Sequence, residues 1–118
     1  RTGWLRRLAD EGIEVHVRSI FLQGLLLMEP NSRPAYFGEW AYLFNVWDRL
    51  IDSMGVTRAA ACIGFISQHA DISRAIVGID SISHLEQVLD VSRQPVVIDA
   101  NGLYSEDSGL IDPFNWRV

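Results

Sequence analysis

Lysine is absent from the 118-residue sequence, so all ten basic residues are arginine. This absence excludes a Schiff-base lysine, a P-loop lysine and any other catalytic ammonium group on this chain. Cysteine is nearly absent too, since Cys62 is the single one. One thiol makes neither an internal disulfide nor a cysteine-rich metal site, and it fits a reducing, cytoplasmic compartment. We therefore expect no metal site.

A basic surplus and long hydrophobic runs are also missing. Fifteen acidic and ten basic residues give a net charge of -5, whereas a protein that binds a nucleic-acid backbone carries a basic face. No apolar run approaches the roughly 18 residues that a membrane helix needs. We expect neither a nucleic-acid nor a membrane partner. The start, Arg1-Thr2-Gly3-Trp4, has neither an initiator methionine nor a signal-peptide core, so we expect a chain cut from a longer protein.

The patterning of the remaining sequence is that of a globular chain with alternating helices and strands. Apolar residues three or four apart predict the helices, and apolar-polar alternation predicts the first strand. The predicted elements are a helix over Gly3–Glu11, a strand over Ile13–Phe21, helices over Phe37–Met54 and Thr57–His69, a strand over Ile72–Ile79, a helix from Ser83 to about Val91, and a tail over residues 99–118.

The sequence predicts that two of these elements are buried. The run Ala75-Ile76-Val77 is typical of a parallel strand covered on both faces. The helix over Thr57–His69 is apolar almost all round, and we expect it between layers. The order of elements predicts an α/β fold of parallel βαβ units. Two strands alone leave both sheet edges bare, so either other copies complete the sheet or part of the parent is missing.

Ligands of parallel α/β folds bind at the carboxyl ends of strands. Two segments qualify, Arg18–Gly24 after the first strand and Gly78-Ile79-Asp80-Ser81 after the second. A glycine that leaves a strand, followed by serine at a helix start, presents free backbone N–H groups and favours phosphate. The same join of glycine and Ser81 also fits ordinary capping. Ser83 and Glu86 have the capping-box spacing for the start of the last helix. His84 is a candidate reader of an anionic ligand.

Other notable side chains are expected to be structural. Trp40 and Trp47 lie seven apart on one helix stripe, which predicts core positions. Cys62 has no base partner in the sequence, which favours a buried thiol over a nucleophile. Three acids of the tail are expected to be solvated rather than paired: Glu106, Asp107 and Asp112.

The stretch Glu14–Leu26, with the sequence EVHVRSIFLQGLL, resembles the aldo/keto reductases. So does AIVGIDS over Ala75–Ser81, followed by HLEQ from His84. The ending LIDPFNW over Leu110–Trp116 looks like that of a bacterial subgroup of oxidoreductases. This resemblance covers nearly the whole chain and implies a (β/α)8 TIM barrel. Such a barrel takes about 250 residues or more, so residues 1–118 would be one partial domain, its C-terminal fragment with about two parallel strands and flanking helices.

The resemblance also implies which residues contact an NADP(H) cofactor in the parent protein. Three match the loop that lies along the pyrophosphate: Ser19, Phe21 and Gln23. Three match the loop that holds the adenosine phosphate end: Gly78, Asp80 and Ser81. Two match positions near the 2′-phosphate and the adenine: His84 and Gln87.

Two residues depart from the family pattern. Arg18 stands where many members place the tyrosine that stacks on nicotinamide, and Val88 cannot make the amide contact of the family asparagine. The catalytic Asp, Tyr, Lys and His of the family lie on early strands, so no catalytic residue is expected on this chain. We expect the parent to reduce aldehyde or ketone groups of small molecules, and this chain alone to be inactive and to bind the cofactor weakly.

Two other functions stay open. In the first, the chain is a truncated barrel module that binds a nucleotide or a partner protein without catalysis. In the other it is a self-assembling interaction module, because bare strand edges and apolar helix faces favour a homo-oligomer. Four copies of two strands would rebuild an eight-stranded ring.

Overall fold

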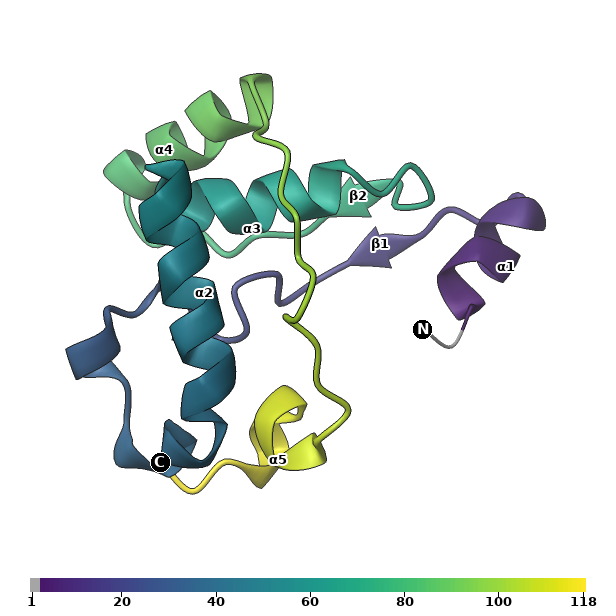
Figure 1. The fold of residues 1–118 in the computed structure, drawn as a ribbon. Coiled ribbons are helices and arrows are strands. Elements are labelled where there is room, and N and C mark those ends of the chain that lie inside the picture. Colours follow the sequence, from purple (N-terminus) through teal and green to yellow (C-terminus); the bar gives the residue numbers. More distant parts are fainter. Residues whose placement is uncertain (1–2) are drawn as a thin grey trace.

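The computed structural model describes residues 3–118 and has a mixed α/β fold (Figure 1). Its helices are α1 (Trp4–Asp10), α2 (Ala41–Met54), α3 (Arg58–Ser67), α4 (Ile82–Arg93) and α5 (Ser108–Ile111). Its strands are β1 (His16–Val17) and β2 (Arg74–Ala75). Short 3-10 helices are η1 (Leu25–Leu27), η2 (Pro30–Ser32), η3 (Ala35–Trp40) and η4 (Pro113–Asn115). The predicted order of helices and strands is confirmed.

The two strands pair in parallel, as predicted. His16 lies opposite Arg74, and Val17 lies opposite Ala75. The amide of Ile76 extends the ladder by donating to the carbonyl of Val17 at 2.8 Å. Within residues 3–118 the sheet contains these two strands and no third.

Both strands are shorter than the predicted spans over 13–21 and 72–79. Alternation marks residues that suit a strand, but a ladder forms only where a partner backbone lies alongside. The prediction that the second strand is covered on both faces was wrong for the described chain. Both residues of β2 are exposed, and the side chain of Ile76 is 57% exposed.

One core cluster joins α2 and α3 to the segment after α4. Its buried members are Phe21, Trp47, Ile51, Ala61, Cys62, Ile63 and Ile98. The consecutive residues 60–64 of α3 are all buried, which confirms the expectation from its all-round apolar sequence. The indole N–H of Trp47 donates to the carbonyl of Leu26 at 3.1 Å, so this buried aromatic has its polar atom satisfied.

A second cluster is built where the tail packs on the start of α2. Its buried members are Leu25, Phe37, Trp40, Leu43, Phe44 and Leu110. The rings of Phe37 and Trp116 meet edge to face, with centroids 4.9 Å apart. The core positions predicted for both helix tryptophans are confirmed.

Glu106 and Asp107 are exposed, as expected for the tail acids, whereas Asp112 is partly buried; two of these acids also cap short helices. Asp107 accepts hydrogen bonds from the amide of Gly109 at 2.8 Å and from the indole of Trp40 at 3.0 Å. Asp112 accepts from the amide of Phe114 at 3.1 Å. Each aspartate is the N-cap of a short helix, a position that favours a side-chain oxygen acceptor.

Helix α1 stands apart from the other helices in Figure 1, and none of its residues is buried. The side chain of Trp4 is 58% exposed. The helix ends at Asp10, and Gly12 follows in the left-handed conformation with φ of 72°. The amide of Ile13 then donates to the carbonyl of Leu8 at 2.9 Å. On the apolar side of α1, Leu5, Leu8 and Ala9 are half-buried and Trp4 is exposed.

A partly buried ionic cluster links the η2 region to α2 and α3. Asp48 receives hydrogen bonds from Arg33 at 2.7 Å and from Arg58 at 2.7 Å. The side chains of Arg33, Asp48 and Arg58 are only 8%, 16% and 10% exposed. Burial raises the pKa of Asp48, but the hydrogen bonds and charges of the two arginines outweigh it and hold that pKa below its ordinary value.

None of the helices within residues 3–118 is by itself long and apolar enough to cross a membrane. The segments Ala35–Met54 and Arg58–Ser67 meet the length and composition only as a pair, which is bent by 94° at its break.

Candidate functional site

The loops that follow the two parallel strands begin at the same edge of the sheet. Residues 18–24 follow β1 and residues 76–81 follow β2, so both loops begin at the carboxyl ends of paired strands. The rings of Phe21 and His84 then approach to 6.3 Å between centroids, tilted by 41°. The structure thus brings together the two segments that the sequence marked as candidate ligand loops.

The loop after β1 has an unusual backbone. Three non-glycine residues, Ser19, Leu22 and Gln23, have φ values of 58°, 48° and 53°, and Gly24 follows at 84°. Left-handed backbone is costly for side chains other than glycine, and it persists where surrounding structure holds it. Here the amide of Leu22 donates to the carbonyl of Ser19 at 2.8 Å. The loop therefore has a defined, tightly turned shape.

This shape separates the predicted cofactor residues of the loop. The side chains of Ser19 and Gln23 are exposed, whereas Phe21 is 9% exposed and belongs to the core. Phe21 is therefore placed to hold the loop against the start of α4, and Ser19 and Gln23 are the ones open to a ligand.

Helix α4 begins two residues earlier than its predicted capping box. Ser81, with φ of -151°, is the N-cap, and its hydroxyl accepts from the amide of His84 at 3.1 Å. The prediction of Ser83 as the cap was wrong, because the backbone is already helical from Ile82. Capping by Ser81 satisfies one of the free N–H groups of the helix start. The interpretation of Ser81 as a capping residue is confirmed. His84 lies in the first turn of α4, as the sequence predicted.

His84 is held by contacts on both sides. Its Nδ1 lies 3.1 Å from Oδ1 of Asp80, and its side chain is 22% exposed. Asp80 is 88% exposed. The imidazole is thus oriented between a carboxylate and the Phe21 ring, at the positive end of a helix dipole. An anion at this helix start would meet an imidazole whose position is set in advance.

The other predicted site residues lie on the surface. Gly78 and Gln87 are exposed, as are Asp80 and Ser81. Val88, the residue that departs from the family amide, is half-buried and packs on the core cluster of α2 and α3. Its apolar side chain therefore has a packing role in this chain.

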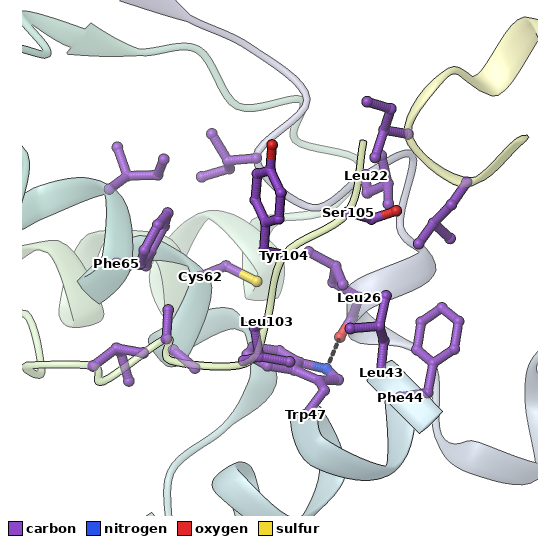
Figure 2. A pocket seen from close by; sticks show the side chains of 17 residues that line it. Leu22, Leu26, Leu43, Phe44, Trp47, Cys62, Phe65, Leu103, Tyr104 and Ser105 are labelled. Carbon is purple, nitrogen blue, oxygen red and sulfur yellow. Dashed lines mark hydrogen bonds between the residues drawn. The ribbon is translucent and has the colours of Figure 1, made fainter. Parts of the chain in front are cut away.

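An apolar pocket lies behind the same loop. It has a volume of about 230 Å³ and is lined by the β1–η1 loop, α2, α3 and residues 98–111. Figure 2 shows Leu26, Trp47, Cys62, Leu103 and their neighbours around this space. Sequence reasoning did not find the pocket, because its walls come from segments far apart in the chain.

Cys62 is a wall residue of that pocket and is 5% exposed. Burial raises the pKa of its thiol to about 12, since a thiolate is poorly solvated in an apolar environment. The thiol is therefore protonated at neutral pH, which agrees with the expectation of a structural rather than a nucleophilic cysteine.

A separate polar group sits at the other end of the sheet. Oε1 of Glu14 lies 2.7 Å from Nε2 of His16 and 2.9 Å from Nε of Arg74. The hydrogen bond from His16, followed by that from Arg74, lowers the pKa of Glu14. All three side chains are largely exposed, and the group joins β1 to β2 across the ladder. It lies away from the carboxyl ends of the strands.

Among residues 3–118 no group of three or more His, Cys, Asp and Glu side chains is arranged to hold a metal ion. Comparison with known proteins found no matching family model, no matching curated protein and no matching solved structure.

Proposed function

We propose that this chain is the C-terminal part of an NADP(H)-dependent aldo/keto reductase barrel and that it contributes to the nucleotide end of the cofactor site. The observation that carries the proposal is the 6.3 Å approach of Phe21 and His84. It joins the loops that follow two parallel strands, where α/β barrels bind their ligands. The loop sequences are those in which the chain resembles the reductases.

The incomplete sheet supports the fragment part of the proposal. Apolar side chains near β1 and β2 are open, with Ile13 at 48%, Ile76 at 57% and Ile79 at 41% exposed. Further strands of a barrel would cover such residues, and two strands are too few to form an independent sheet. The catalytic groups would then come from the earlier strands of the parent protein, which would reduce aldehyde or ketone groups.

Each exposed loop residue has a place in the proposed site. Ser19 and Gln23 would lie along the pyrophosphate, and the α4 start would take the phosphate at the adenosine end through its backbone N–H groups. His84 would contact the 2′-phosphate, and Gln87 would contact the adenine. The cofactor, when bound, supplies the hydride for carbonyl reduction. The chain's own residues bind and orient its nucleotide half.

A nucleotide titration tests these residues directly. The probe is adenosine 2′,5′-bisphosphate added to the ¹⁵N-labelled chain, with adenosine 5′-monophosphate as the comparison. We expect weak binding, with amide shifts confined to residues 19–24 and 78–87. The substitution His84→Ala should reduce the preference for the 2′-phosphorylated nucleotide, and His69→Ala, which changes an exposed histidine elsewhere, should not. Shifts outside these loops, or none at all, would count against the proposal.

The enzymatic part has its own test. The isolated chain with NADPH and a reactive aldehyde should show no turnover, and robust turnover would overturn the fragment proposal. The reading frame that encodes the chain should also encode earlier barrel strands that carry Asp, Tyr, Lys and His.

Self-assembly is the second candidate function, and the unpaired strands favour it. Within residues 3–118 neither strand has a second partner, and the side chain of Trp4 on α1 is 58% exposed. Sedimentation velocity on the chain would give a concentration-dependent oligomer if copies complete each other's sheet. The substitution Ile76→Ser should weaken that oligomer, whereas Ser83→Ala on the exposed side of α4 should not. A well-folded monomer at high concentration contradicts this function.

A further inference from the structure

The pocket behind the β1–η1 loop carries an inference that does not rest on the proposed function. We propose that it binds a small uncharged apolar molecule, such as an alkylbenzene. An apolar cavity of about 150 Å³ stays dry and takes benzene. The present pocket has about 230 Å³, so by proportion it would accept about nine non-hydrogen atoms.

The side chains that line the pocket determine the chemical class of its ligand. None of the side chains that line the pocket is charged. Leucine, isoleucine, alanine and aromatic side chains make up nearly all of its surface (Figure 2). Burying a charged ligand against such walls is costly because nothing replaces its hydration. A polyanionic dinucleotide therefore does not fit here, and this pocket is separate from the proposed cofactor contacts.

The few polar groups on the walls have partners within the chain. The indole N–H of Trp47 donates to the carbonyl of Leu26 at 3.1 Å. The hydroxyl of Ser105 accepts from the amide of Asp107 at 3.1 Å, and that of Tyr104 donates to Glu106. With these bonds formed, the pocket recognises its ligand by shape and by removal of apolar surface from water.

One wall is an irregular segment with an anchor at each end. At the first end the side-chain Nε2 of Gln68 donates to the carbonyl of Ile98 at 2.9 Å, and the backbone amide of Ile98 donates to Oε1 of the same side chain. At the other end the indole of Trp40 donates to Asp107 at 3.0 Å. The segment between them supplies Ala100 and Leu103 to the pocket. These hydrogen bonds attach both ends of the wall to α3 and to the start of α2.

Binding of n-propylbenzene, which has nine carbon atoms, tests the proposal with the full 118-residue chain. We expect saturable shifts of methyl signals from Leu103 and Ile111, and magnetisation transfer from the probe to those methyl groups. The comparison ligand is 3-phenylpropanoate, which carries a carboxylate on a similar skeleton. It should bind at least about tenfold more weakly, as a desolvated charge without a partner costs more than 1.4 kcal/mol.

A filling variant locates the site. Ala100→Leu places a larger side chain in the pocket and should weaken propylbenzene binding at least tenfold. Ala70→Leu makes the same change at an exposed residue outside the pocket and should leave the affinity unchanged. If Ala100→Leu fails to fold, the magnetisation transfer in the unsubstituted chain still decides the location.

Three results would overturn the proposal. The first is a folded chain that shows no saturable shifts with propylbenzene. The second is equal binding of 3-phenylpropanoate, which would mean that the pocket does not select against charge. The third is an affinity that falls as the chain concentration rises, because a side chain of a second copy would then be the occupant. Constant affinity across chain concentrations supports the small-molecule site.

Discussion

The indole N–H of Trp40 donates a hydrogen bond to Oδ2 of Asp107 at 3.0 Å, although 67 residues separate the two in the sequence. The other carboxylate oxygen of Asp107 accepts from the amide of Gly109 at 2.8 Å. One acid therefore joins the tail to the start of α2 and also caps α5. The tail is part of the core rather than an appendage.

Removal of this acid should loosen the tail. We expect Asp107→Ala to lower the free energy of unfolding by about 2 kcal/mol, because a cap and a bond to a buried indole are lost together. Chemical denaturation followed by tryptophan fluorescence measures the change. Asp99→Ala is the matched control, since Asp99 accepts only a local bond from Asn101 and should cost much less. Equal losses in the two variants would contradict the anchoring role.

Gly64 allows close approach between α3 and the segment after α4. A Cβ atom at this position would lie 2.2 Å from the carbonyl oxygen of Val96, a distance that forces the backbone to move. We expect Gly64→Ala to destabilise the chain by about 1–3 kcal/mol through overpacking. Gly38→Ala is the control, because nothing lies within 4 Å of the added atom. Thermal unfolding compares the two, and the prediction fails if the control loses as much stability.

The partly buried ionic cluster should be sensitive to loss of the Asp48 carboxylate, which both arginines contact. Asp48→Asn removes the carboxylate charge that the guanidinium groups of Arg33 and Arg58 share, although Arg58 keeps an ion pair with the exposed Glu29 at 3.2 Å. Removal of one partner of a buried pair costs about 3 kcal/mol, and we expect a loss of up to that size because the cluster is partly buried. Asp52→Asn, on an exposed position of the same helix, should cost less than about 0.5 kcal/mol. Urea denaturation of both variants at neutral pH measures the difference.

Acidification should lower the free energy of unfolding through the same cluster. The pKa of Asp48 is lower in the folded chain than its ordinary value, so the unfolded chain binds the proton first and acidification favours unfolding. The stabilising contribution is complete above about pH 4 and is lost as the pH falls through the folded-state pKa. Unfolding free energies measured from pH 7 to pH 2 should fall less steeply for Asp48→Asn than for the unsubstituted chain. Parallel curves would rule out this linkage.

Cys62 should react slowly with Ellman's reagent in the folded chain. Burial raises its pKa to about 12, so roughly one thiol in ten thousand is ionised at pH 8. The rate should rise sharply in denaturant, where the thiol regains ordinary exposure and pKa. A rapid reaction of the native chain, or a rate plateau between pH 7 and 9, would contradict a buried protonated thiol.

The helices were predictable because their apolar periodicity and end residues agree. Gly12 and Gly55 adopt the left-handed conformation that is common just after a helix, and Thr57 caps α3 by accepting from the amide of Ala60 at 3.1 Å. Strand lengths were not predictable, because the ladder depends on where the partner backbone lies. The N-cap of α4 was misplaced for a related reason, since Ser81 and Ser83 are both good capping residues and only the backbone path decides between them.

The two candidate loops were found from sequence because parallel strands place their carboxyl ends together. The left-handed conformation of Leu22 had no sequence signal, since leucine rarely adopts it. The ionic cluster was missed because Arg33 and Arg58 lie 15 and 10 residues from Asp48, outside the spacing of helix pairs. The pocket was not predictable either, because the tail forms part of its wall. The packing of the tail on α2 gives no periodic pattern in the sequence.

The contact between Phe37 and Trp116 has a consequence for synthesis of the chain. Phe37 and Trp40 leave the ribosome long before their partner residues 107–116 are made. The aromatic surface at the start of α2 therefore stays uncovered until residues 107–116 emerge, because long-range contacts form only after the intervening chain is available. A premature stop codon a few positions before Leu110 would release a polypeptide with this surface permanently open, and we expect such a product to aggregate or to be degraded.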